Sequence, residues 1–146
     1  MRPADADNRL LSSQPYLDRG DRLTISETLD RLEALYDLMA ITALSGTRPD
    51  AMEIVLLRQQ FVIAYLDFVR AVDADEMLAA HPRLRSSLTD ALDTMRIRLM
   101  SYTMDWQPER IDADPEGYRD AAERIAKMVG SFIADTRESL TRLAAA

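Results

Sequence analysis

The chain has 146 residues, of which 47% are hydrophobic and 29% charged, and its formal net charge at pH 7 is −7. Because it contains no cysteine, one histidine and four glycines, the composition excludes disulfide scaffolds, zinc fingers, thiol nucleophiles, ligation by several histidines and glycine-rich phosphate loops. The acidic balance argues against non-specific binding to nucleic acid or to an anionic membrane, since both need an excess of cations. We expect an acidic, all-α globular protein without a cofactor.

The first 22 residues are polar and contain no apolar core of the kind that a secretory signal needs. We expect a tail that is flexible or that docks through Leu10, Leu11, Tyr16 and Leu17. The remainder, 23–146, is predicted to be one domain. Arginine supplies 17 of the 18 basic residues and there are 20 alanines, which is typical of a GC-rich bacterial genome, and we expect a cytoplasmic protein.

The first predicted helix runs from Thr24 to Leu44. Thr24 and Glu27 have the spacing of a capping box, in which a hydroxyl and a carboxylate each accept a hydrogen bond from a backbone N–H group. Gly46 and Pro49 follow the last helical residue and end the helix. The apolar residues recur at steps of three and four, which places them on one helix face: Ile25, Leu29, Leu32, Tyr36, Met39 and Ala43.

The second predicted helix, from Asp50 to Leu78, is the most apolar, with 16 apolar residues among positions 51–72. Arg58 and Asp67 interrupt this stretch. A membrane span would leave such groups unsolvated, so we do not expect one. A helix this apolar is predicted to lie centrally or to be covered from two sides.

Arg58 falls inside the apolar stripe of this second helix. An unpaired buried charge costs several kcal/mol, so the guanidinium must reach water, form an ion pair or bind something. Three interpretations stay open: a stem that packs while the guanidinium reaches water, a structural ion pair, or a contact to an anionic ligand or partner. For the ligand, we expect a pocket between helices with Tyr36, Tyr65 or Tyr102 near Arg58.

His81 and Pro82 open the third predicted helix, which continues to Trp106, and Pro115 opens the fourth, which continues to about Leu143. Proline fits the first helical turn, where its missing N–H is not needed, and Asp114 is the expected N-cap of the fourth helix. The segment 107–114 is expected to be a loop. The stripe of the third helix is Leu84, Leu88, Leu92, Met95, Leu99, Tyr102 and Trp106, and that of the fourth is Tyr118, Ala122, Ile125, Val129, Phe132, Thr136, Leu140 and Leu143.

No segment alternates with the period of a strand, and there is no Asn-Gly or Asp-Gly hairpin turn. The first two connections are short, which makes sequential helices antiparallel neighbours. The predicted fold is therefore an antiparallel up-down-up-down four-helix bundle preceded by the N-terminal tail.

The segment Asp112–Glu123 has acids at its first, third, fifth, ninth and twelfth positions and glycine at its sixth. Over these twelve residues it resembles the calcium-binding loop of the EF-hand family, which implies a calcium-responsive module. It departs from that pattern at Glu116, which is long for the fifth position, and at Arg119, where an apolar residue normally stands. The alternative is a helix start with Asp114 as N-cap and acids that favour the helix dipole.

No group of residues marks a catalytic centre. His81 lies at a helix start without the surroundings of a phosphotransfer histidine, and one histidine cannot supply the Glu-x-x-His pairs of a di-iron bundle. No serine or threonine has an evident base within reach along the sequence. We expect a protein that is not an enzyme and has no metal site.

The third helix carries a second apolar line almost opposite its main stripe, formed by Ile97, Met100 and Met104. The second helix has a similar flank, formed by Met52, Leu56 and Ile63. One stripe is enough for a bundle core, so the extra lines favour a contact with a partner helix or a second subunit. The alternatives are a covering by the N-terminal tail, or apolar residues scattered over the surface in the ordinary way.

The acids Asp73, Asp75 and Glu76 stand at the predicted end of the second helix, where negative charge opposes the dipole. They indicate either a solvated face or a docking point for a basic partner.

The leading prediction is a non-enzymatic interaction protein, such as a small acidic regulator, adaptor or chaperone. It would bind another protein or itself, as a homodimer, through apolar helix faces, with Ile97, Met100 and Met104 as contacts. The alternatives are a ligand-binding sensor with an anion site at Arg58 and the calcium-responsive module. Nucleic acid and membrane are not expected partners.

Overall fold

The computed structural model describes residues 23–44 and 48–145, so the predicted tail lies outside the described residues. These residues form helices and no strand, which confirms the all-α prediction. None of the described helices combines the length and apolarity that crossing a membrane requires. The helices are α2 (Ile25–Leu44), α3 (Ala51–Ala74), α4 (Glu76–Ala79), α5 (Pro82–Asp105), α6 (Pro108–Ala113) and α7 (Pro115–Ala145).

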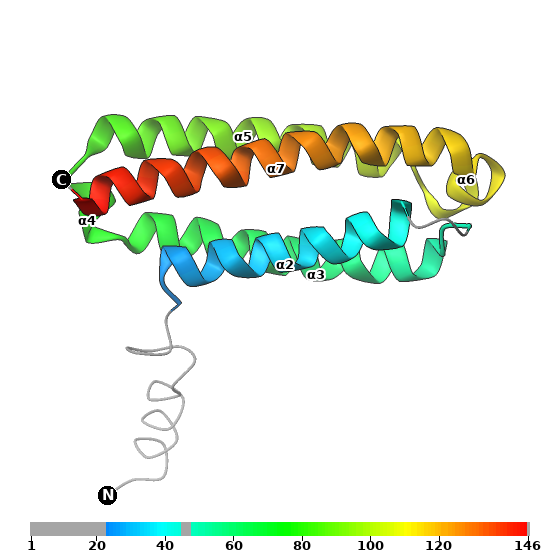
Figure 1. The fold of residues 1–146 in the computed structure, drawn as a ribbon, viewed down its shortest axis with the longest axis horizontal. Coiled ribbons are helices and arrows are strands. Elements are labelled where there is room, and N and C mark those ends of the chain that lie inside the picture. The colour runs from blue at the N-terminus through cyan, green and yellow to red at the C-terminus, as the bar shows by residue number, and fades with distance from the viewer. Residues whose placement is uncertain (1–22, 45–47, 146) are drawn as a thin grey trace, which may run out of the picture.

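The four long helices lie side by side along one axis, and α4 and α6 lie at opposite ends of them (Figure 1). In this view α5 and α7 form the upper layer and α2 and α3 the lower layer. The helix α2 packs along both α3 and α7, and α5 packs along α7. The α5 and α3 backbones share almost no close approach over the described residues.

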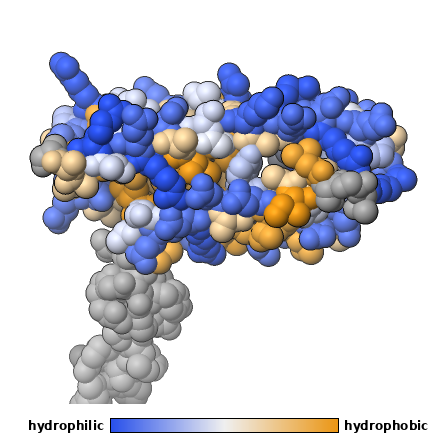
Figure 2. All heavy atoms as spheres, in the orientation of Figure 1, coloured by the Kyte–Doolittle hydropathy of each residue, from blue (hydrophilic) through white to orange (hydrophobic). Residues whose placement is uncertain are grey.

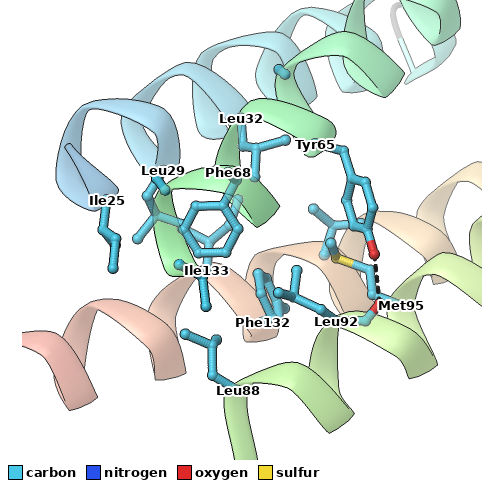
Figure 3. Close-up of a cluster of buried hydrophobic side chains, with 14 of the residues drawn as sticks. Ile25, Leu29, Leu32, Tyr65, Phe68, Leu88, Leu92, Met95, Phe132 and Ile133 are labelled. Atoms are coloured by element: carbon cyan, nitrogen blue, oxygen red, sulfur yellow. Dashed lines mark hydrogen bonds between the residues drawn. The ribbon is translucent and has the colours of Figure 1, made fainter. Parts of the chain in front are cut away.

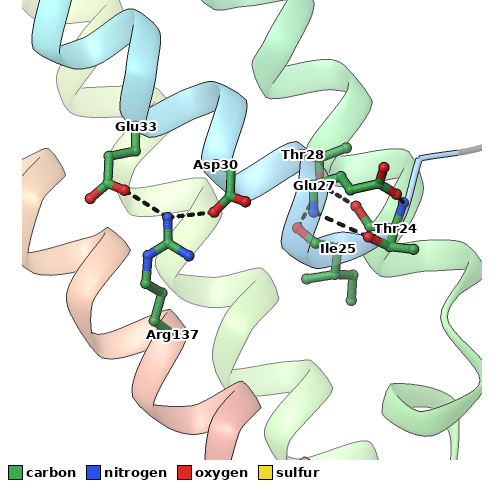
Figure 4. A network of polar contacts seen from close by, with 7 residues as sticks. All are labelled: Thr24, Ile25, Glu27, Thr28, Asp30, Glu33 and Arg137. Carbon is green, nitrogen blue, oxygen red and sulfur yellow. Dashed lines mark hydrogen bonds and ion pairs between the residues drawn. The ribbon is translucent and has the colours of Figure 1, made fainter.

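Local capping residues fix where α2 and α3 begin. At α2 the predicted capping box is confirmed: the Thr24 N–H donates to Glu27 Oε1 (3.0 Å), and the Glu27 N–H donates to Thr24 Oγ1 (3.1 Å) (Figure 4). These hydrogen bonds lower the pKa of Glu27, because the backbone and hydroxyl of Thr24 stabilise the carboxylate. At α3 the Asp50 side chain accepts from the N–H groups of Met52 and Glu53.

The predicted second helix is wrong beyond Ala74, because the chain turns at Asp75 and starts a new helix. Asp75 has an extended backbone, and its side chain accepts a 2.9 Å hydrogen bond from the Leu78 N–H. The short helix α4 then buries Leu78 completely.

Asp75 is both the C-cap of α3 and the N-cap of α4, and Glu76 lies in the first turn of α4, where negative charge is favourable. Asp73 stays in the last turn of α3 and pairs with Arg85 of α5 at 3.6 Å. These contacts within the chain account for Asp73 and Asp75 without a basic partner.

The predicted loop 107–114 is also wrong in part, since it contains the helix α6. Pro108 occupies its first turn, and α6 buries Ile111 against the end of the domain. The predicted cap of the next helix is confirmed: Asp114 Oδ1 accepts from the Gly117 N–H at 3.0 Å. In α7 a side chain at Gly117 would collide with Asp114 and approach Trp106, so this close packing requires glycine.

The core consists of two clusters of buried apolar side chains. The larger cluster fills the space between the four long helices, and its centre holds Phe68 and Phe132, whose rings meet edge to face at 6.1 Å (Figure 3). The smaller cluster lies at the α6 end and contains Tyr102, Trp106 and Tyr118. Burial of these stripes on α2, α3, α5 and α7 is the main force that holds the helices together.

Candidate partner-binding surface

The helix α2 is joined to both of its neighbours by charged and polar side chains. Arg137 of α7 pairs with Asp30 (2.8 Å) and with Glu33 (2.7 Å) of α2 (Figure 4). These carboxylates raise the pKa of Arg137, with the hydrogen bond to Asp30 as the largest cause. The Tyr36 hydroxyl also donates to the Ala126 carbonyl, and Arg31 pairs with Asp67 of α3 at 3.0 Å.

Between α3 and α5, long side chains bridge a wider space. The Tyr65 hydroxyl of α3 donates to the Leu92 carbonyl of α5 at 3.1 Å (Figure 3). Arg58 Nη1 donates to the carbonyl of Trp106, the residue that follows α5, at 2.8 Å. Between these two hydrogen bonds, the outer surfaces of α3 and α5 are exposed.

The three predicted contact residues lie on this uncovered stretch of α5. Ile97, Met100 and Met104 are 59%, 52% and 71% exposed, and all three stand between Leu92 and Trp106, the two bridged positions. Arg96 donates to the Met100 sulfur at 3.4 Å from the preceding turn, and Met100 is still 52% exposed.

A matching set of apolar side chains lies on α3. Val62 falls between the bridging residues Arg58 and Tyr65, and Leu66 follows one turn later on the same side of the helix. The predicted flank residues extend this set along the outer surface. The exposed large apolar residues of α3 are Met52, Leu56, Val62, Ile63 and Leu66. We define the α3–α5 face as these five residues together with Ile97, Met100 and Met104.

The opposite side of the molecule offers less apolar surface. Figure 2 shows the face formed by α2 and α7, where apolar atoms gather in the seam between the layers and over the C-terminal part of α2. The exposed large apolar residues of α2 are Leu38, Ile41 and Leu44. They are three residues on one helix, whereas the α3–α5 face has eight on two helices.

Arg58 is half-buried at one edge of the α3–α5 face. Its guanidinium carbon lies 5.1 Å from the centre of the Tyr102 ring, and Nη1 donates to Trp106. A cation at this position also offsets the negative end of the α5 dipole. Of the three tyrosines expected near Arg58, Tyr102 lies beside the guanidinium, and the two donor nitrogens Nε and Nη2 are buried without a hydrogen-bond partner.

Aromatic rings seal the domain next to Arg58. Tyr102 stacks on Tyr118 at 6.0 Å, and Trp106 meets Tyr118 at 5.7 Å. The guanidinium carbon of Arg110 in α6 lies over the indole of Trp106, 4.1 Å from the ring centre. Burial raises the pKa of Tyr102 far above its usual value, and Tyr118 adds to the shift while Arg58 opposes it.

The segment Asp112–Glu123 is divided between two helices. Asp112 lies in the last turn of α6, Asp114 caps α7, and Glu116 lies in the first turn of α7. Within the described residues, no three acidic or histidine side chains come together in a way that could hold a metal ion. The geometry here is that of the alternative interpretation, a capped helix start with acids in the first turn.

His81 occupies the N-cap position of α5, but its side chain makes no capping hydrogen bond. Its Nδ1 atom instead lies 2.8 Å from the Met77 carbonyl, and the ring is exposed. The side chain therefore joins α4 to the start of α5.

The sequence interpretation missed a groove between α5 and α7, lined on α5 by Arg98 and on α7 by Arg124. A signal was present in the sequence. Ser87, Ala91, Thr94 and Ser101 follow one another at steps of four, three and seven, which places a line of small side chains beside the leucine stripe of α5.

The chain matches no known protein-family model, and no curated protein or solved structure is detectably similar to it.

Proposed function

We propose that this protein is a non-catalytic interaction module that binds a protein partner through the α3–α5 face, with a second copy of itself as the first partner. The observation that carries the proposal is the eight large apolar side chains left exposed on two adjacent helices. Apolar patches that continue over several residues mark interaction sites more often than single exposed residues do. Methionine at three of the eight positions offers adaptable contacts to a partner helix.

The architecture behind this proposal is an antiparallel up-down-up-down four-helix bundle made by α2, α3, α5 and α7. The order of the packed pairs, α3 on α2, α2 on α7 and α7 on α5, supports this topology. In such a bundle α3 and α5 are also neighbours, and the wide space between them presents two helix surfaces to a partner helix.

The test compares the solution mass of the wild-type protein with that of Met100→Asp, by light scattering over a range of protein concentrations. Met77→Asp is the matched control, because Met77 is 50% exposed against 52% for Met100 and lies on α4, outside the α3–α5 face. We expect the wild type and M77D to form dimers and M100D to stay monomeric. Monomers for all three proteins, with no protein partner retained during purification, would contradict the proposal.

A second candidate function is an anion sensor at Arg58, and the observation that favours it is the pair of buried N–H groups without a partner. A buried donor without an acceptor destabilises the folded protein, and an anion that accepts its hydrogen bond would remove this cost. Acetate should then raise the melting temperature of the wild type more than chloride does at equal ionic strength. Arg58→Met should abolish the difference. Equal effects of the two salts on the wild type would exclude the site.

A further inference from the structure

The seam between α5 and α7 contains two adjoining hollows, each of about 370 Å³. Arg98 and Met128 line both of them, so the two form one groove along the seam. This groove lies on the side of α5 that faces α7, while the α3–α5 face lies on the other side. Each volume falls within the range of about 300–1,000 Å³ that is typical of small-molecule sites.

The two halves of the groove differ in chemistry. In the first, Leu88, Met95 and Phe132 provide an apolar floor. In the second, Arg98 and Arg124 face the same hollow from α5 and α7, next to Tyr102 and Trp106. One end of the groove thus suits a hydrocarbon group, and the other suits an anion.

The two arginines are available to a ligand. Both are exposed, and neither forms a hydrogen bond or ion pair with another described residue. Asp105 is the one acidic residue that lines their hollow, so the lining carries two positive charges and one negative. This local excess of positive charge stands out in a chain with a net charge of −7.

Asp135 lies at the apolar half of the groove. Its carboxylate repels an anionic group there and favours the orientation in which the anion lies at the arginines. Size, apolar floor and charge therefore fit one linear molecule with an apolar chain and a single anionic end.

We propose that the α5–α7 groove binds a long-chain carboxylate, that is, a fatty acid. The carboxylate lies between Arg98 and Arg124, which form charge-assisted hydrogen bonds with it. The acyl chain lies on Leu88, Met95 and Phe132, which form the buried floor of the groove, and its own apolar surface is removed from water. This site is separate from the proposed partner surface, so one can fail without the other.

The test is a titration of the full-length protein with dodecanoate below its micelle concentration, followed by calorimetry and by the fluorescence of Trp106. Trp106 is the one tryptophan of the chain and lines the arginine hollow, so its emission reports occupancy. We expect saturable binding of one dodecanoate per chain with a change in Trp106 emission. Loss of charged hydrogen bonds in R98Q/R124Q should weaken binding about tenfold or more.

Three further proteins control this test. R83Q/R142Q removes the same charge from the same two helices outside the groove lining and should bind like the wild type. Ala91→Phe fills the apolar half from an exposed position, so it should abolish binding without lowering the melting temperature. Met100→Asp alters only the α3–α5 face and should leave binding unchanged.

Several results would overturn the inference. They are the absence of saturable binding, equal weakening in R98Q/R124Q and R83Q/R142Q, or binding of dodecyltrimethylammonium as tight as that of dodecanoate. If Met100→Asp weakens dodecanoate binding and Ala91→Phe does not, the ligand lies on the α3–α5 face, which would also contradict the site.

Discussion

The helices α2 and α5 occupy comparable places beside α7, yet they are held in different ways. Arg137 and Tyr36 tie α2 to α7, and Arg31 ties it to α3. On α5 four of 24 residues are buried, against five of 20 on α2. The lesson is that the α2 seams are built for stability, while α5 leaves apolar surface on one side and a groove on the other.

The largest expected difference concerns leucine truncation in the two regions. Leu29 of α2 is fully buried, so Leu29→Ala should lower the free energy of unfolding by about 2–5 kcal/mol. Leu88 of α5 borders the open groove, where the surroundings and water can adjust, so Leu88→Ala should cost about 2 kcal/mol or less. Urea denaturation measures both losses, and equal losses would contradict the difference between α2 and α5.

The dependence of the free energy of unfolding on alkaline pH reports how tightly the end of α5 is packed. Burial raises the pKa of Tyr102, so the folded state keeps its proton at a pH where the unfolded chain releases it. The stabilisation is fully present below about pH 10, the ordinary tyrosine pKa, and falls by about 1.4 kcal/mol per pH unit above it.

Tyr36 and Tyr65 also have raised pKa values, mainly from burial, so the wild type should lose stability through all three groups. Tyr102→Phe should flatten the decline above pH 10 more than Tyr36→Phe does. The measurement is urea denaturation between pH 8 and 11 for the three proteins. A steeper or unchanged decline in Tyr102→Phe would show that Tyr102 is not sealed at the end of α5.

The ion pairs of α2 should contribute more to the free energy of unfolding than the ion pair of α5, although both contributions are smaller than those of the leucines. Arg137→Met removes a cation shared by Asp30 and Glu33 and leaves these two carboxylates facing each other. Because Arg137 is partly exposed and screened by solvent, the expected loss is about 1 kcal/mol. Arg85→Met breaks the 3.6 Å pair with Asp73 and should cost less than about 0.5 kcal/mol. Thermal denaturation at low and high salt tests both, and a larger loss for Arg85→Met would reverse the comparison.

The smallest effect is expected at the start of α2. The pKa of Glu27 is lowered by Thr24, so the capping box contributes stability above the ordinary glutamate pKa of about 4.3 and loses it as the pH falls through the folded-state value. Glu27→Gln should remove this contribution at neutral pH and have little effect near pH 2, because the Thr24 N–H group then has no carboxylate to stabilise. Acid titration of the melting temperature measures the difference, and a constant gap at all pH values would rule out the carboxylate as its source.

Helical periodicity was enough to predict the four long helices and to place Ile97, Met100 and Met104 on an outer surface. It could not predict the break at Asp75, because an aspartate there fits either a continuing helix or a cap, and the burial of Leu78 decides between them. The helix α6 depends in the same way on the burial of Ile111.

The sequence predicts sequential helices as neighbours but could not predict how closely each pair packs. Periodicity defines the apolar stripe of each helix but not the spacing between helices, so neither the wide α3–α5 space nor the α5–α7 groove follows from it. The sequence could not predict the surroundings of Arg58 for the same reason. Its neighbours Tyr102 and Trp106 belong to α5 and to the residue that follows α5.

Hydrogen–deuterium exchange of the wild-type protein at low and high concentration can show whether the α3–α5 face is the partner surface. We predict that exchange slows at high concentration in α3 around Val62 and in α5 around Met100, with no change along the α2–α7 seam. Slowing confined to α2 and α7, or exchange that is independent of concentration in a protein that is already dimeric through another face, would contradict this proposal.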